Sequence, residues 1–556
     1  MKFLIKSFKG GLSDYENKGT EGSFKFGKNL NIRKKIDSLS CNQALKDETP
    51  PTAGFHGLIL FIVNASDGNS YGFDDAGYIY KRTSNGIWTQ VYNDSANGAI
   101  KGAEEWFDKN GKAYLYWATD TRENRKELPG LSNWTDVNTS TDFFFVTTFS
   151  GIGVDDLTQG GTYVGTAAHV YDIQITTIGT PDKFKWRKDS GAWSAEILIT
   201  GGAQIITDGL TVTFISTAGH ALNDIWTITV SASTWPKTNL TSADWHTHKV
   251  AVGVLNIANK DKLAFVGYDN SYTNESLTLI PGNLVKALVE RGNLVIVGTG
   301  RIDNSETGSL FAWNTISDNW DSKKLIPAKG VNALIDTEFP LAQVGINGGL
   351  FLSDMQNVMP IKSFPNGGQV NPDGVENDQG LALFGVFGNG AGYTGIYSFG
   401  RKGKNNPVVL NLEYQFDCDQ IGSVKKIGSD LIFSYKVGAT YGIKIVDTAN
   451  KAQAVYDSID LVPNTTFQQI PNFSSLVLTT KALPAGCKIE VWYKLNKQGS
   501  FIQARMQDEA LQFVTANATE AVFLLGENAN IFEIEIILIP NGNNTPEIYT
   551  IEPYLQ

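Results

Sequence analysis

The sequence predicts an all-β protein: a β-propeller that carries an inserted β-sandwich and is followed by a C-terminal β-sandwich. Three observations lead to this class. Glycine accounts for 56 of 556 residues and aromatic residues for 11%, a composition typical of short strands joined by tight turns. Apolar segments followed by glycine or asparagine turns recur roughly every 40 to 50 residues, the period of a propeller blade. Long amphipathic helical patterns are nearly absent.

Residues 1–50 are expected to form an extended N-terminal arm. Residues 24–26 and 30–32 alternate apolar and polar side chains, as half-buried strands do. This apolar content favours an arm that packs against a partner or against the body of the protein over a frayed terminus. The glycine pair at 10–11 precedes no helical pattern, so we do not expect it to bind phosphate.

The propeller is predicted over residues 51–139 and 234–464, with six or seven candidate blades. Apolar runs such as residues 57–63, 292–298 and 381–387 suggest that each blade is a four-stranded sheet with an apolar inner strand. Such blades bury their faces only against their neighbours, so they should close into a ring. No WD, kelch or Asp-box motif repeats cleanly, and a set of separate sandwich domains is the alternative.

Two further segments have a sandwich pattern. Residues 140–233 are rich in Thr, Gly and Ile and alternate strongly at 171–176 and 210–214, which predicts an antiparallel sandwich inserted at a blade loop. Residues 465–556 alternate at 487–495 and again near the end of the chain. A C-terminal sandwich is therefore expected there.

Charge and hydropathy limit which binding partners and which cellular compartment are expected for this chain. The net charge of −11 creates no broad field that would attract nucleic acid or an anionic membrane. The nearest basic patch, Arg33, Lys34 and Lys35, is expected to be a solvated loop. No apolar run reaches the roughly 18 residues that span a bilayer, and the first residues do not form a signal peptide. We therefore expect no membrane-spanning segment and synthesis in the cytosol.

The three cysteines, Cys41, Cys418 and Cys487, lie far apart in the sequence and form no C-x-x-C pair. Their odd number excludes a full disulfide framework, and three isolated thiols do not have the spacing of a metal cluster. Buried free thiols are the favoured interpretation.

Motifs for catalysis and metal binding are missing. The sequence has no G-x-S-x-G elbow, no Walker P-loop and no H-E-x-x-H. His246 and His248, two residues apart, would share one face of a strand and could bind a metal, but no acidic cluster accompanies them. Residues 67–75 offer oxygen ligands without EF-hand spacing, which favours a hairpin turn. We therefore assign no catalytic, cofactor-binding or metal-binding residue.

Two sets of side chains keep other functions open. Propellers host glycosidases, which need two carboxyl groups across a cleft. Adjacent carboxylates occur at Glu104-Glu105, Asp74-Asp75 and Asp155-Asp156. Tryptophans near predicted loops could stack on sugar rings, although packing in the core is expected more often. These are Trp88, Trp134, Trp235 and Trp320.

The order of segments resembles that of bacteriophage tail proteins. Residues 8–45, with a Gly-Gly segment followed by an N-L-x-I-R strand, look like the start of tail proteins that carry propellers. The succession of arm, propeller and C-terminal sandwich is similar to that of tail nozzle and tail-tip proteins. Residues 162–194 and 219–230 look like the immunoglobulin-like decorations of phage structural proteins.

This resemblance implies a virion structural protein, a nozzle or tail-tip ring component that is made in the host cytoplasm. Its partners would be copies of itself in a ring, with sixfold symmetry favoured, together with other tail proteins. It would act through assembly and the architecture of the DNA channel, with transient contact to phage DNA. The alternatives are a tail protein that binds a host-surface receptor or glycan and, second, a propeller glycoside hydrolase.

Overall fold

The computed structural model confirms the predicted all-β class. The short 3-10 helix η1 (Ser95–Asn97) is the one helix among the described residues, and no helix there is long and apolar enough to cross a membrane. The structure describes residues 4–13, 21–33, 37–139, 141–303, 307–337, 341–344, 348–401, 407–462 and 470–555.

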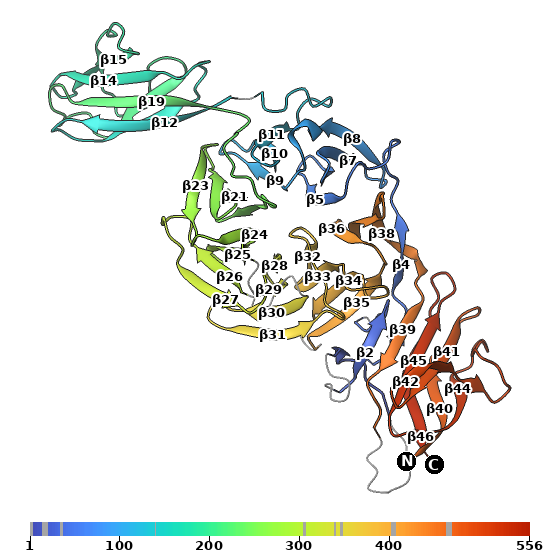
Figure 1. Ribbon diagram of the computed structural model, residues 1–556. Helices are drawn as coiled ribbons and strands as arrows, with labels where there is room; N and C mark the ends of the chain where they lie inside the picture. The colour runs from blue at the N-terminus through green and yellow to red at the C-terminus, as the bar shows by residue number, and fades with distance from the viewer. Residues whose placement is uncertain are drawn as a thin grey trace.

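A β-propeller forms the centre of the molecule (Figure 1). Within the described residues it has seven sheets, and the innermost strand of each contacts the innermost strand of the next until the last returns to the first. The first blade has strands β5 (Ile59–Asn64), β6 (Ser70–Asp74), β7 (Tyr78–Arg82) and β8 (Trp88–Asn93), and the second has β9 (Gly102–Phe107), β10 (Ala113–Ala118) and β11 (Glu123–Leu128). The third blade has β20 (His248–Ala251), β21 (Val254–Asn259), β22 (Lys262–Val266) and β23 (Tyr272–Thr278), the fourth has β24 (Asn283–Arg291), β25 (Leu294–Arg301), β26 (Gly308–Trp313) and β27 (Ser322–Ile326), and the fifth has β28 (Ala333–Ile335), β29 (Leu341–Val344), β30 (Gly349–Ser353) and β31 (Val358–Ser363). The sixth blade has β32 (Val375–Asp378), β33 (Leu381–Val386), β34 (Gly395–Gly400) and β35 (Val409–Gln415), and the seventh has β36 (Gln420–Ile427), β37 (Asp430–Val437), β38 (Thr440–Lys451) and β4 (Gln43–Asp47).

The apolar strands of the blades differ in position from the prediction. The sequence pattern suggested that the inner strand of each blade is the apolar one. In the structure, most of the fully buried strands are second or third in their blades, for example β10, β26, β33 and β34, while the inner strand β28 is fully buried and apolar as predicted. The inner strands border the central axis, where one face meets a cavity, so strands such as β32 retain polar, half-buried side chains.

The arm closes the propeller ring. β4 adds to β38 as the outer strand of the seventh blade, with Leu45 opposite Val446. Just beyond it, Thr49 forms a parallel bridge with Ile87 of the first blade. The last blade is therefore completed by a strand from the start of the chain, which fixes the ends of the ring to each other.

The inserted segment leaves the edge of the second blade. Its two sheets, β12-β19-β14-β15-β16 and β13-β18-β17, use no strand from outside the segment, and its buried residues form a separate core. On return, Lys237 bridges Glu123 at the edge of the blade, in the place of a fourth strand. The strands are β12 (Thr141–Ser150), β13 (Leu157–Gly161), β14 (Val170–Thr177), β15 (Lys183–Lys188), β16 (Ile197–Leu198), β17 (Gln204–Ile205), β18 (Leu210–Phe214) and β19 (Ile225–Thr234).

The C-terminal sandwich is assembled from both ends of the chain. One sheet has the order β1-β2-β39-β45-β41-β42 and the other β3-β46-β40-β44-β43, so three arm strands belong to it. Its strands are β1 (Gly11–Leu12), β2 (Ser23–Lys28), β3 (Leu39–Ser40), β39 (Ala454–Ser458), β40 (Asn472–Thr480), β41 (Lys488–Leu495), β42 (Gln498–Gln503), β43 (Arg505–Met506), β44 (Glu520–Asn528), β45 (Phe532–Ile539) and β46 (Glu547–Leu555).

The predicted domain boundaries therefore change at two places. Residues 1–50 were expected to be one arm, but β4 belongs to the propeller while β1, β2 and β3 belong to the sandwich. β39 falls within the predicted propeller segment 234–464 and yet pairs with β2 and β45. The residue pattern of a single strand does not indicate which sheet the strand joins, because that depends on pairing with strands far away in the sequence. The immunoglobulin-like character of the insertion stays a prediction.

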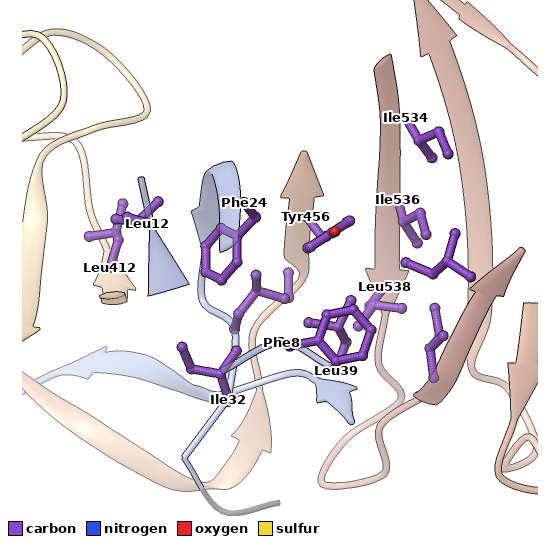
Figure 2. Packing of buried hydrophobic residues seen from close by; sticks show 14 of the residues in the cluster. Phe8, Leu12, Phe24, Ile32, Leu39, Leu412, Tyr456, Ile534, Ile536 and Leu538 are labelled. Atoms are coloured by element: carbon purple, nitrogen blue, oxygen red, sulfur yellow. The ribbon is translucent and has the colours of Figure 1, made fainter. Parts of the chain in front are cut away.

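One continuous hydrophobic core joins the arm, the fifth and sixth blades and the sandwich (Figure 2). Phe24 of β2 lies against Tyr456 of β39 with ring centroids 5.7 Å apart, and Phe8 meets the same ring edge-on. Leu412 of the sixth blade is on one side of these rings and Ile536 of β45 on the other. The arm thus packs against the body of the protein, one of the two predicted arrangements.

Candidate functional site

A cavity on the propeller axis is the candidate site that the fold itself creates. It measures about 270 Å³ and is lined by residues from all seven innermost strands. Its charged and titratable lining consists of Glu104, His248, Lys249, Asp336, Asp373, Glu376 and Lys425.

Lys425 of β36 and Asp373 form the central ion pair of this cavity. The ammonium lies 2.7 Å from the carboxylate, which also accepts hydrogen bonds from the Ile62 amide at 3.1 Å and the Ser423 hydroxyl at 2.6 Å. Burial opposes the charge of Lys425, but Asp373 and Glu376 outweigh it and raise the pKa of the lysine. Asp373 therefore connects the sixth blade to the seventh and the first.

Glu376 of β32 is the carboxyl group in the cavity with the clearest perturbation. Burial raises its pKa, while Lys425 acts in the opposite direction. Its side chain accepts hydrogen bonds from the amides of Lys426, at 3.2 Å, and Asn377, at 3.1 Å. Glu104 of β9 shares the cavity and lies close enough to raise the pKa of Lys425.

These groups neutralise one another over much of the lining. Asp336 is paired with Arg291 at 2.6 Å, as Asp373 is with Lys425. Ion pairs between lysines and carboxylates of this kind hold the inner strands in register. A small polar molecule could also bind in the cavity by replacing some of these contacts with its own. The geometry therefore provides either a structural network or a small polar site.

His246 and His248 serve the contact between the second and third blades. The ring nitrogens of His246 lie 2.7 Å from the carbonyl oxygens of Ala258 and Asp120. Those of His248 lie 2.6 Å from the His246 carbonyl and 2.8 Å from the Glu123 carboxylate. All four nitrogens are thus engaged by protein oxygens. Within the described ranges, no group of three or more His, Cys, Asp or Glu is arranged to hold a metal ion.

The close packing around these histidines depends on Gly102 at the start of β9. A Cβ atom at this position would lie 1.8 Å from the His246 carbonyl oxygen and 2.4 Å from Nδ1 of His248. Backbone atoms cannot give way by that amount, so only glycine fits between the two blades.

The adjacent carboxylates are separated by the fold. Asp74 accepts hydrogen bonds from the Tyr78 amide at 2.6 Å and the Tyr80 hydroxyl at 3.0 Å, and burial raises its pKa to about 6. Asp75 accepts from the Leu58 amide. Both therefore shape the first blade, and among the predicted pairs only Glu104 reaches the axial cavity.

The remaining members of the pairs also support loops. Glu105 accepts hydrogen bonds from the Ser66 amide and hydroxyl in a neighbouring blade. Asp155 and Asp156 lie at one end of the inserted sandwich. Asp67, in the candidate calcium segment, accepts from the Tyr71 hydroxyl at 2.7 Å within its own hairpin.

The four loop tryptophans mostly pack inward, as expected. Trp88, Trp134 and Trp235 are buried, so they cannot stack on a sugar ring in this conformation. Trp320 is half-buried against Phe311, with ring centroids 5.3 Å apart. Of the four tryptophans considered for stacking on a sugar ring, Trp320 is therefore the one that remains a candidate.

Other sequence-based expectations have mixed outcomes. Cys41 and Cys487 are buried free thiols, as predicted, while Cys418 is only half-buried. Arg33 is no solvated loop residue: it lies 3.0 Å from Glu413 and donates to carbonyl oxygens of the sixth blade, including that of Val409 at 2.7 Å. Lys34 and Lys35 lie outside the described residues.

A buried latch at the base of the insertion was not anticipated. The carboxylate of Asp142, on β12, forms an ion pair with the fully buried Arg125 of β11. It also accepts hydrogen bonds from the Trp235 indole and from the side-chain amide of Asn270, each at 3.3 Å. A lone aspartate next to a strand carries no sequence signal for such a role.

Comparisons with solved structures find only low similarity. No family model and no curated protein matches the chain. The chain is similar to the WD40 β-propeller domain of Doa1, with 10% identity, a TM-score of 0.38 and coverage of 72% of this chain and 97% of that one. The corresponding values for the Dos1 propeller are 12%, 0.34, 72% and 94%. For the computationally designed Ika8 protein they are 10%, 0.32, 72% and 99%. The assignment of the propeller depends on the sheets themselves, and similarity at this level indicates no function.

Proposed function

We propose that this chain is a structural subunit of a bacteriophage tail, placed in the nozzle or at the tail tip. It would act by assembling with copies of itself and with other tail proteins around the DNA channel. Contact with the DNA would be transient, because a net charge of −11 provides little attraction for phosphates.

One observation carries the proposal: one hydrophobic core joins the arm, the fifth and sixth blades of the propeller and the C-terminal sandwich. Strands from the start of the chain close the ring of blades and complete both sheets of the sandwich. A protein built in this way resists local opening, because neither terminal module can separate without exposing the shared core. Such resistance suits a part that bears load in an assembly.

The test is direct imaging of the purified full-length protein, with its mass measured by light scattering. We expect a closed ring of copies, with sixfold symmetry favoured, and antibodies raised against the chain should label the tail of the particle. A protein that stays monomeric and whose antibodies label no part of a virion would contradict the proposal.

The glycoside-hydrolase alternative is favoured by one observation, the raised pKa of Glu376 in the axial cavity that Glu104 also lines. Glycosidases use a carboxyl group with a raised pKa as the general acid. Release of reducing ends from polysaccharides would support this alternative if the Glu376→Gln variant lost it. The Glu105→Gln variant is the matched control, since Glu105 caps a loop and does not line the cavity.

A further inference from the structure

The inserted sandwich has one end beside the propeller and a second end, formed by loops, that lies away from it. β12 and β19 are ten residues long and pair from Thr141 opposite Thr234, beside the propeller, to Ser150 opposite Ile225. At about 3.4 Å per residue, the far end of this pair lies roughly 30 Å from the propeller edge. Figure 1 shows the insertion extending away from the ring in this direction. We call this end the distal tip; it comprises loops 151–156, 178–182, 199–203 and 215–224.

A buried Asp–His–Asp arrangement holds these loops together. Nδ1 of His220 lies 2.9 Å from Asp182 and Nε2 lies 3.1 Å from Asp156, and the side chains of His220 and Asp182 are fully buried. Asp182 also accepts a hydrogen bond from the Gly179 amide at 2.6 Å, and Asp156 from the Ser216 amide. Three of the four loops are therefore fixed through one histidine.

Asp224 satisfies further backbone donors of the tip. It accepts hydrogen bonds from the amides of Ile152 at 3.1 Å, Gly153 at 3.2 Å and Ala221 at 2.6 Å. These donors would otherwise need water, because loop amides have no strand partner. The tip can consequently leave water without exposing these amide groups unpaired.

The outward surface of the tip carries aliphatic side chains together with the exposed uncharged residues Thr180, Thr200, Thr217 and Asn223. Its four loops contain no Lys, Arg or Glu and no Phe, Tyr or Trp. The one exposed carboxylate there, Asp155, accepts a hydrogen bond from the Trp226 indole at 2.8 Å. Large apolar side chains project from the tip and its border: Ile152 is 95% exposed, Ile215 79%, Leu222 57%, Ile178 51%, Leu198 47% and Val154 42%.

We propose that the distal tip inserts shallowly into the interface of a lipid bilayer. Protein hot spots are enriched in Trp, Tyr and Arg, and sugars are held by aromatic rings, neither of which the tip supplies. Projecting aliphatic side chains suit a fluid apolar medium, which needs no complementary pocket. The absence of lysine and arginine matches a zwitterionic surface, so anionic lipid is not required.

Flotation of the full-length protein with phosphatidylcholine vesicles tests the proposal. The wild type should float with the vesicles and remain bound when salt is raised, because the contact is apolar. The double variant Ile152→Ser, Ile215→Ser should partition at least about tenfold more weakly. The matched control is Ile302→Ser with Ile316→Ser, which removes isoleucines of 60% and 89% exposure in the propeller and should bind like the wild type.

Each other outcome would overturn the proposal. These are failure of the wild type to float, equal weakening in both double variants, and binding only to anionic vesicles. A fourth is self-association, measured by light scattering, that the tip substitutions abolish in the absence of vesicle binding, since the tip would then contact a second copy of the chain. The inference does not depend on the proposed place in a tail, and the ring assembly can be tested separately.

Discussion

Glu48 connects the closing strand of the propeller to its first blade. Its carboxylate forms a bidentate contact with the buried Arg82 and accepts a hydrogen bond from the Trp88 indole at 2.7 Å. The side chains of Glu48 and Arg82 are 2% and 6% exposed. Removing one partner of such a buried pair leaves a charge without compensation, which costs more than the pair contributes.

Glu48→Gln is therefore expected to lower the free energy of unfolding by about 3 kcal/mol. A urea titration followed by tryptophan fluorescence measures this. The control is Lys46→Ala on β4, two residues before Glu48, because Lys46 is 58% exposed and 3.9 Å from Asp447. The control should cost less than about 0.5 kcal/mol. Equal effects of the two substitutions would mean that the Glu48 contacts do not secure the ring.

A second residue-scale feature is the buried acidic group around Asp457 in the sandwich. Lys25 of the arm lies 3.0 Å from Glu533, and Glu535 and Asp460 are close by. Burial raises the pKa of Asp457 to about 8, with Lys25 acting against it and the three other carboxylates adding to it. Asp457 is therefore protonated in the folded protein at neutral pH and ionised in the unfolded chain.

This shift predicts a pH dependence with a definite sign. Between about pH 4 and pH 8 the folded protein keeps a proton that the unfolded chain has lost, so raising the pH destabilises the fold. Asp457→Asn cannot ionise, and its stability relative to the wild type should rise with pH across this window, by up to about 1.4 kcal/mol per pH unit. Urea titrations at several pH values measure the difference. A difference that is constant with pH would show that Asp457 titrates normally.

At the scale of elements, β2 decides how the arm is held. Phe24 is fully buried between Tyr456 of β39 and the sixth blade, and the strand pairs with β39 along its length. Strand β2 is thus a member of a sandwich sheet and also acts as a wedge, because it fills the space between the sandwich and the propeller. Its pairing partner comes from the segment that links the propeller to the sandwich, so the arm fixes that link.

Phe24→Ala should remove about 3–5 kcal/mol of stability, because a buried aromatic ring leaves a cavity. Hydrogen exchange should speed up at β2 and β39 and stay unchanged at β14 and β19 of the insertion, whose core is separate. Phe107→Ala is the control, since Phe107 is 41% exposed. Unchanged exchange at β39 would contradict the role of the arm as a wedge.

At the scale of the whole molecule, the insertion is an addition to the propeller that is latched at its base. Asp142 and Trp235 flank the buried Arg125, and the paired residues Phe143 and Ala232 follow immediately. The two strands therefore enter and leave side by side. A short turn can connect them without disturbing the latch.

Deleting residues 144–231 and joining Phe143 to Ala232 through an Asn-Gly turn should leave a folded protein. Its melting temperature should lie within a few degrees of the wild type's, measured by circular dichroism. Deleting residues 140–233 removes Asp142 as well and should be less stable, by about 3 kcal/mol or more. An insoluble product from the shorter deletion, or equal stability of the two, would contradict the latch.

Much of the architecture could be predicted from local patterns. Apolar runs and glycine turns identified strands such as β5 and β37, and their period predicted a propeller. Alternation predicted the strands of both sandwiches, because one face of each is buried. The role of β4 could not be predicted in this way, since its half-exposed sequence fits any outer strand and its partner β38 lies at the other end of the propeller.

The sites were less predictable than the fold. His246 and His248 had a spacing compatible with metal binding, but the carbonyl of Ala258 and the carboxylate of Glu123 occupy them instead. The axial cavity combines side chains from seven strands that are far apart in the sequence, so no short sequence motif contains the lining residues of two blades. Spacing within a strand reports which face a side chain takes, and only closure of the ring decides which faces meet.

The sequence by itself determined the class of structure, the separate pattern of the insertion and the acidic, helix-poor character of the chain, because these depend on composition and on periods of a few residues. Only the tertiary structure decided that the arm closes the ring and completes the sandwich, that Asp142 latches the insertion and that aliphatic side chains gather at the distal tip. The physical reason is that pairing of strand edges and burial of charge depend on partners brought together by folding, and local pattern carries no record of them.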